Sequence, residues 1–94
     1  MAAIKNASEA MATLSSAVGF TTLPGNAQAA LVAVNTKGIH YRIDGGTPTS
    51  TVGMPVAASS TFQVVGRNNL ENFKVIEDSA SADIYVTYYD HVDF

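Results

Sequence analysis

The 94-residue sequence lacks cysteine and contains few charged residues, with five lysines or arginines against eight aspartates or glutamates. Without cysteine, the chain has neither disulfide bonds nor thiolate metal sites. The basic residues are scattered and the net charge is −3, so no patch can neutralise phosphates and we expect no nucleic-acid partner. Long hydrophobic runs are missing too. The longest, residues 27–34, is broken by Gln28 and is far shorter than the roughly 20 residues that span a bilayer, so we expect no membrane partner.

The composition otherwise fits one small globular domain. Hydrophobic residues make up 47% of the chain, but charged residues only 14%, and 17 serines and threonines take their place. A surface of small neutral polar groups costs little free energy to desolvate. This composition is typical of a protein covered by neighbours, and equally of a β-rich domain with threonine in its strands. The first residues do not form a secretory signal, so we expect a protein made in the cytoplasm.

Hydrophobic periodicity predicts an all-β fold. Apolar and polar residues alternate at 39–43, 61–65, 71–76 and 82–89, and residues 29–35 are apolar enough to be buried on both faces. A weaker strand is expected at 51–56, where Pro55 restricts the segment to a sheet edge. Such short strands separated by turn residues predict an antiparallel β-sandwich. Its expected core consists of Leu31, Ile39, Tyr41, Ile43, Phe62, Val64, Phe73, Val75, Ile84 and Val86.

A rigid corner is predicted after the strand at 39–43. The Asp44-Gly45 dipeptide is the kind that supplies positive backbone angles in a tight turn. Pro48 cannot donate a further ladder hydrogen bond, and threonine hydroxyls on either side can bind nearby backbone. Such a preorganised loop loses little entropy on binding, which makes it a candidate interface. The candidate residues are Asp44, Gly45, Gly46, Thr47, Pro48 and Thr49.

Residues 1–18 differ from the rest because they are rich in alanine, serine and methionine and lack aromatic residues. Met11, Leu14 and Val18 are spaced as on one face of a helix, and Glu9 could complete a capping box. We expect residues 1–18 to form a short helix or an extended arm outside a sandwich domain at 19–94. Its apolar residues would pack on that domain or on a neighbouring subunit, and we take these three residues as candidate interface residues.

Residues that could carry chemistry are few. His40 lies beside Arg42 on a strand and His91 near the chain end, and neither pattern supplies a serine nucleophile with its base. Asp90, His91 and Asp93 could bind a cation, but they lack the spacing and glycine of a calcium loop and are more typical of a solvated acidic tail. We therefore expect no catalytic activity, no cofactor and no bound metal.

The residues 39–49 read I-x-Y-x-x-D-G-x-x-P-T, which resembles a corner of the immunoglobulin-like domain at the C-terminus of chitobiases and hexosaminidases. This resemblance implies an immunoglobulin-like sandwich. The residues themselves leave open a carbohydrate-binding module, in which Tyr85, Tyr89 and the Asp44 loop would contact the sugar. The two tyrosines share one strand face, so ordinary cross-strand packing is the alternative.

A wider series of motifs runs from Ala30 to Tyr89: A-L-V-x-V, I-x-Y-R-x-D-G-x-x-P-T, T-V-G, G-R-x-x-L-x-N-F and A-D-I-Y-V-T-Y-Y. This series is similar to small virion proteins of tailed bacteriophages. The resemblance implies a non-enzymatic protein located in the virion, either a capsid decoration (cement) protein on the outer capsid surface or a neck or tail-adaptor protein. It implies the major capsid protein or other virion proteins as partners, and a homo-oligomer.

Overall fold

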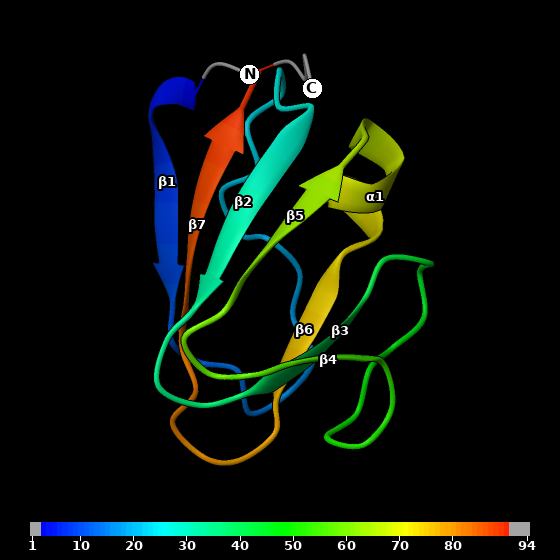
Figure 1. Ribbon diagram of the computed structural model, residues 1–94. Helices are drawn as coiled ribbons and strands as arrows, with labels where there is room; N and C mark the ends of the chain where they lie inside the picture. Colours follow the sequence, from blue (N-terminus) through cyan, green and yellow to red (C-terminus); the bar gives the residue numbers. More distant parts are fainter. Residues whose placement is uncertain (1–2, 91–94) are drawn as a thin grey trace.

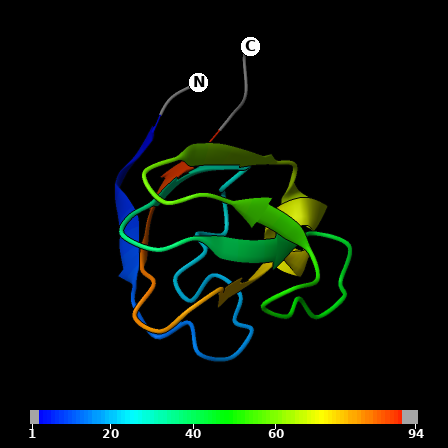
Figure 2. The same ribbon diagram turned by 60° about the horizontal axis from the view of Figure 1, so that its bottom comes forward.

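The computed structural model describes residues 3–90, which form two antiparallel sheets packed face to face (Figures 1 and 2). The four-stranded sheet has the order β1 (Ala3–Met11), β7 (Ile84–Tyr89), β2 (Ala29–Val34), β5 (Thr61–Val65). The three-stranded sheet has the order β4 (Met54–Val56), β3 (Ile39–Arg42), β6 (Lys74–Glu77), and one short helix, α1 (Arg67–Asn72), follows β5. The predicted antiparallel β-sandwich is confirmed, and the segment with Pro55 is an edge strand as expected.

The last strand, β7, has an interior position because it pairs with β1 on one side and with β2 on the other. In the seven-stranded immunoglobulin arrangement the first and last strands belong to different sheets. Here β1 and β7 are neighbours in the same sheet, so the strand order of this sandwich is different. The inward residues of β7 are Ile84, Val86 and Tyr88, and all are buried against the other sheet, as expected of a strand in the middle of a sheet.

The core lies between the sheets and contains the predicted residues with one exception. Six of the ten are fully buried, and Tyr41, Ile43 and Phe62 pack against them. Leu31 instead lies on the outer face of β2, where it pairs with Gln63 and Thr87. The prediction was wrong because β2 is apolar on both faces, so alternation could not show which face points inward. The expectation that β2 is buried on both faces was also wrong, since Leu31 is only half-buried.

Aromatic rings join the two sheets at Phe73. This ring stacks on Phe20 with a centroid distance of 4.2 Å, and it also contacts Tyr41 of β3 and Phe62 of β5. Phe20 in turn meets Tyr88 of β7 edge to face at 5.5 Å. Such pairs contribute about 0.5–1.5 kcal/mol each beyond the burial of area. The cluster therefore connects β3, β5, β7 and the segment between β1 and β2.

The amino-terminal segment is a strand of the four-stranded sheet, so of the two expected alternatives, a short helix or an extended arm, the extended one is found. Residues 3–11 pair with β7, with a shift of register between Ala3 and Ser8, and they are therefore part of the sandwich itself. The period-two pattern is present but disguised, because Glu9 occupies an inward position between Ala7 and Met11. A carboxylate on the inner face hides the alternation from a hydrophobicity pattern.

The Glu9 carboxylate is accommodated by hydrogen bonds from Tyr88 and from the neighbouring threonines. The hydroxyls of Tyr88 and Thr21 donate to it, and the Thr21 backbone N–H donates at 3.2 Å. Burial alone would raise the pKa of Glu9, but the hydrogen bonds from Thr21, Tyr88 and Thr22 outweigh burial and leave the pKa below its ordinary value. Burial and the neighbouring carboxylate raise the pKa of Tyr88.

The residues after β1 close the edge of the three-stranded sheet. The Glu77 N–H donates to the Leu14 carbonyl at 2.9 Å, and Val18 and Val75 exchange backbone hydrogen bonds of 3.0 and 2.8 Å. Leu14 is 0% exposed and Met11 only 6%. This segment was expected to pack either on the domain or on a neighbouring subunit. The described residues show Met11 and Leu14 packed within the domain.

The helix α1 replaces the first part of a strand that the sequence predicted at 71–76. Its Leu70 is buried, and the Leu70 N–H donates to the Gly66 carbonyl at 3.0 Å. Arg67 binds Glu71 one turn later at 3.0 Å and also donates to the Pro24 carbonyl at 2.6 Å. The spacing of four between Arg67 and Glu71 is the signal that could have indicated a helical turn.

Replacing Leu14 with alanine should strongly destabilise the domain. The side chain is fully buried in the core, and such a truncation costs about 2–5 kcal/mol. Urea unfolding followed by tyrosine fluorescence measures the loss. Leu23→Ala is the matched control, because the same atoms are removed from a half-buried position and the loss should be clearly smaller. Equal losses would contradict the burial of Leu14.

Replacing Tyr88 with phenylalanine should weaken the fold in a pH-dependent way. The folded-state pKa of Glu9 is depressed, so its contribution is present above the unfolded pKa and is lost as the pH falls through the folded pKa. At pH 7 the variant should lose about 1 kcal/mol, and the difference should shrink below about pH 4. Urea unfolding across pH gives this comparison. Tyr85→Phe, which removes an exposed hydrogen bond to Ser8, should show a small difference at every pH.

Candidate functional site

The corner after β3 is ordered by an ion pair between neighbours in sequence. The Arg42 guanidinium donates two hydrogen bonds to the Asp44 carboxylate, at 3.0 and 2.7 Å, and the Gly46 N–H donates a third at 3.0 Å. The hydrogen bonds from Arg42, followed by that from Gly46, lower the pKa of Asp44 to about 2. Asp44 in turn raises the pKa of Arg42. Both side chains are therefore charged at neutral pH, and their opposite charges cancel.

The rest of the corner is a tight loop held by its own backbone. Thr49 and Val52 exchange backbone hydrogen bonds of 3.0 and 3.2 Å. Gly45 has a φ of +84°, as the Asp-Gly dipeptide predicted. Gly53 has a φ of +128°, and a Cβ at this position would lie 2.9 Å from the Tyr41 carbonyl oxygen. Only glycine allows the returning chain to approach β3 so closely.

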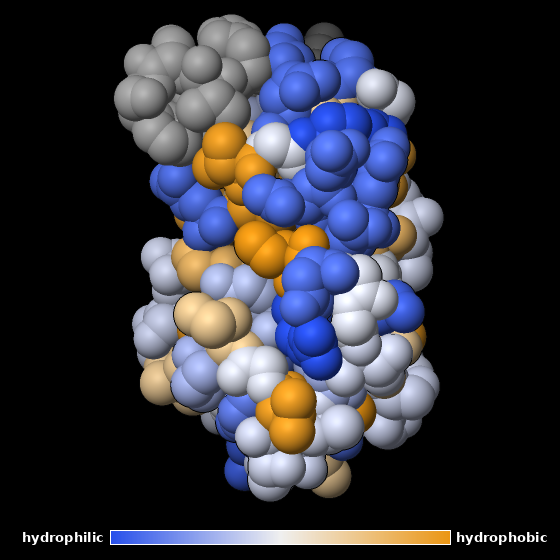
Figure 3. All heavy atoms as spheres, turned by 90° about the vertical axis from the view of Figure 1, so that its right-hand side faces the viewer, coloured by the Kyte–Doolittle hydropathy of each residue, from blue (hydrophilic) through white to orange (hydrophobic). Residues whose placement is uncertain are grey.

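A hollow with a volume of about 360 Å³ opens beside this loop. Met54 at its rim is 58% exposed, and Val52 in the adjoining loop is 49% exposed. Figure 3 shows this side of the molecule, with hydrophobic residues among weakly polar ones and the hydrophilic surface of α1 beside them. The hollow is lined by Tyr41, Arg42, Ile43, Asp44, Gly53 and Met54. It offers an apolar site with a charged but balanced rim, which suits a hydrophobic side chain of another molecule.

All but one of the predicted corner residues reach the molecular surface beside the hollow. Asp44, Gly45, Thr47 and Thr49 are exposed and Gly46 is half-buried. Pro48 is fully buried, so it shapes the loop from inside and cannot contact a partner. Sequence reasoning missed Val52 and Met54 as exposed apolar residues beside the corner. The sequence contained a signal for them, because two apolar side chains flank a glycine in a short segment at a sheet edge. A strand at an edge cannot bury both of its faces.

The other candidate interface residues are not part of this surface. Met11 and Leu14 lie inside the domain core, so the proposal of an interface through these side chains is corrected. Val18 is half-buried and packs against the same core. A second hollow, of about 330 Å³, lies where residues 10–13 face Val18 and Thr21.

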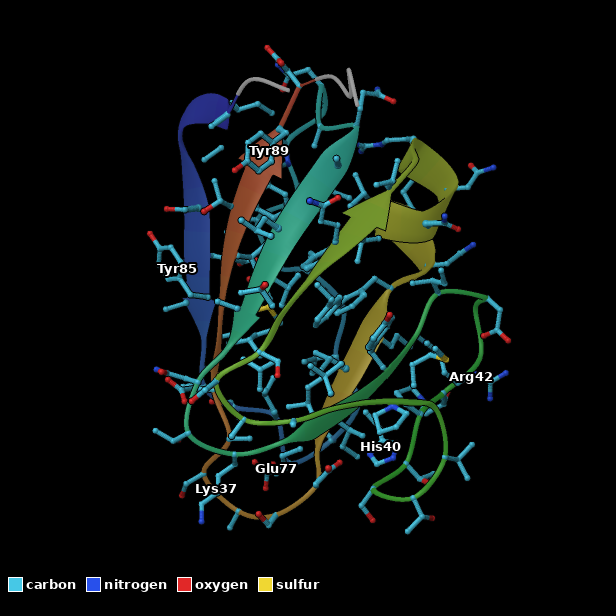
Figure 4. The ribbon with its side chains drawn as sticks, in the orientation of Figure 1. Lys37, His40, Arg42, Glu77, Tyr85 and Tyr89 are labelled. Carbon is cyan, nitrogen blue, oxygen red and sulfur yellow. The ribbon has the colours of Figure 1, made fainter. Side chains whose placement is uncertain are left out.

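The tyrosines proposed for a sugar site are separated from the corner. Tyr85 and Tyr89 project from the outer face of the four-stranded sheet, whereas Asp44 follows a strand of the other sheet. Figure 4 shows Tyr85 and Arg42 on opposite sides of the molecule. Tyr85 is half exposed and donates a hydrogen bond to Ser8 at 2.9 Å. The three groups therefore do not form a single binding site.

The described residues place no catalytic or metal-binding cluster at the corner. The imidazole of His40 is hydrogen-bonded to the carboxylate of Asp78 at the other end of β3. Among residues 3–90, no three acidic, histidine or cysteine side chains lie close enough to hold a metal ion. His91 and Asp93 of the acidic tail lie outside the described residues. Within the same range, no helix is long and apolar enough to cross a bilayer.

Comparisons of the chain with protein-family models, with curated proteins and with solved structures found no match.

Replacing Gly46 with alanine should disconnect the ion pair without unfolding the domain. A Cβ on Gly46 would lie 2.3 Å from the guanidinium carbon of Arg42, and the flexible end of Arg42 can move away. Asp44 would lose its main partner, so its pKa should rise from about 2 toward the ordinary value. Carboxylate chemical shifts in an NMR titration report this pKa. Gly25→Ala, where a Cβ meets nothing within 4 Å, should leave the titration unchanged.

Proposed function

We propose that this chain is a non-enzymatic structural protein of a bacteriophage particle, of the capsid decoration type, and that the corner binds a neighbouring virion protein. The observation that carries the proposal is the exposed apolar hollow at Gly53 and Met54, held against a preorganised loop in which Val52 is also exposed. The resemblance of the motifs from Ala30 to Tyr89 to small virion proteins supports the choice of partner.

The chemistry of the corner favours protein binding over catalysis. Arg42 and Asp44 are bound to each other, and the low pKa of Asp44 keeps this carboxylate deprotonated at neutral pH. A general acid or base works best with a pKa near the operating pH, and this pair offers none. What remains available to a partner is apolar surface and a rim whose two charges are paired with each other.

The energetics suit a protein that binds in many copies. Complete burial of Met54 and Val52 would contribute about 1.5–3 kcal/mol each at most, and the ordered loop loses little entropy on binding. One such contact gives weak binding. A particle surface presents the same site many times, so linked copies gain affinity through multivalency. Because the rim is neutral in sum, the contact should respond weakly to salt.

Replacing Met54 with lysine should reduce binding to particles at least about tenfold, because a charge would have to be buried in the hollow. Particles that lack this protein are incubated with the purified chain and separated on a density gradient. The co-sedimenting protein is then quantified. Thermal unfolding monitors the fold of the variant, which should be unchanged because Met54 is exposed.

Ser79→Lys is the matched control, because it adds the same charge in an exposed turn at the opposite end of β3 from the corner. This variant should bind like the unaltered chain. If the unaltered chain does not sediment with particles, the proposed function is wrong. If it binds and Met54→Lys binds equally well, the assignment of the corner is wrong. Electron microscopy of the loaded particle distinguishes a capsid position from the neck or tail-adaptor alternative.

A further inference from the structure

The outward positions that strand pairing defines on the four-stranded sheet carry no charged residue. Paired residues on neighbouring strands share a face, and the buried residues of β7 define the inner one. The twelve outward positions that the register defines are Ala3, Ser8 and Ala10 of β1, Tyr85, Thr87 and Tyr89 of β7, Ala29, Leu31 and Ala33 of β2, and Thr61, Gln63 and Val65 of β5. Ala29 is buried by its neighbours, and the other positions form a neutral surface on a chain with a net charge of −3.

This face is open, because the described residues place no second layer over it (Figure 1). Tyr85 is 50% exposed and Val65 is 38% exposed, and Leu31 at the centre of the face is half-buried. The remaining positions are alanine, serine, threonine and glutamine, apart from a half-buried Tyr89. Small side chains allow another flat surface to approach to the spacing of about 10 Å that stacked sheets adopt.

The strand edges of the sandwich are protected, so association by adding a strand is disfavoured. The edge of β6 is bonded to residues 14–18, and β4 is a three-residue strand containing Pro55. At β5 the Asn69 side chain donates to the Val65 carbonyl at 2.8 Å, and the irregular register of β1 interrupts its ladder. Proteins block edges in these ways against edge-to-edge pairing. A partner that uses this sheet must therefore use its face.

We propose that a second copy of this chain packs on the outer face, sheet on sheet, about a two-fold axis parallel to the strands and between β7 and β2. Two negative molecules repel each other, and the uncharged outward positions of β7, β2 and β5 are where they can meet without an unpaired buried ion. A partner of opposite charge would find no charge to pair with at these positions.

The distribution of side-chain sizes fits this axis. The half of the face formed by β1 and β7 carries the exposed ring of Tyr85, whereas the β2 and β5 half carries Ala33, Thr61 and Gln63. With this axis, the β1 and β7 half of each copy, which carries the large ring, packs on the β2 and β5 half of the other copy, which carries smaller side chains. It also places Leu31 against the partner's Thr87, because these residues are direct neighbours on the two strands beside the axis.

The size of the face predicts a weak dimer. Four strands about 4.8 Å apart, each with about 20 Å of length, cover roughly 400 Å² per copy, half of the roughly 800 Å² per partner in a stable interface. Association should therefore depend strongly on concentration. It would be most complete where copies are held close together.

The test is sedimentation velocity of the purified chain from micromolar to millimolar concentration, with NMR chemical shifts recorded over the same series. The weight-average sedimentation coefficient should rise with concentration. The shifts that change should belong to the outward residues of β7, β2 and β5. Leu31→Glu and Thr87→Lys, each alone, should weaken self-association at least about tenfold, because each buries an unpaired charge.

Mixing the two variants should restore association, since the axis brings the Leu31→Glu position of one copy against the Thr87→Lys position of the other. A two-fold axis perpendicular to the strands would pair each position with itself and give no restoration. Ser79→Glu, in an exposed turn, is the control and should associate like the unaltered chain.

A chain that stays monomeric at millimolar concentration would overturn the proposal. So would a Leu31→Glu variant with an unchanged dissociation constant for self-association, or a mixture of the two variants that does not associate. If a variant fails to fold in circular dichroism, the concentration-dependent shifts of the unaltered chain decide, and shifts away from the outer face contradict the proposal. The particle-binding assay concerns the other side of the molecule, so either hypothesis can fail alone.

Discussion

The stack of aromatic rings around Phe73 is the interaction on which the arrangement of the sandwich depends. Phe73 directly follows α1, at the point where the chain passes from the four-stranded to the three-stranded sheet. Its ring is buried between Phe20 and the pair formed by Tyr41 and Phe62. The same residue thus fixes where β6 begins, and β6 fixes the position of β3 through their backbone pairing. The Phe73 ring therefore contacts residues of both sheets at the point where the chain passes from one to the other.

Tyr41 connects the corner to this aromatic stack. One face of the Tyr41 ring is stacked on Phe62 at a centroid distance of 4.4 Å, and the residue also lines the hollow. The loop above is held by the Arg42–Asp44 pair and by the close approach of Gly53 to the Tyr41 carbonyl. The hollow is thus formed by groups that are already ordered, and the entropy lost on binding is small.

Charge is distributed in the fold so that two different surfaces stay neutral. At the corner, neutrality arises because opposite charges are paired, and at the outward positions of β7, β2 and β5 it arises because none of these residues is charged. The one carboxylate on the inner face of the four-stranded sheet, Glu9, is satisfied by Tyr88 and Thr21 within the domain. The two neutral surfaces lie on different sides, so a partner at one leaves the other free. This arrangement suits a small domain that works in an array, where each copy contacts its own kind and another protein.

The sequence alone determined those features that depend on neighbouring residues. Alternation identified the strands at 39–43, 61–65 and 82–89, and Asp44-Gly45 identified the corner, because side-chain period and turn chemistry act over a few residues. The tertiary structure decided what depends on distant partners. The inward face of β2 was set by pairing with β5 and β7, which turned Leu31 outward. Residues 3–11 became a strand because β7 offered an open edge and Tyr88 a donor for Glu9. Burial of Pro48 and exposure of Met54 likewise followed from how the loop packs on β3, which no local pattern records.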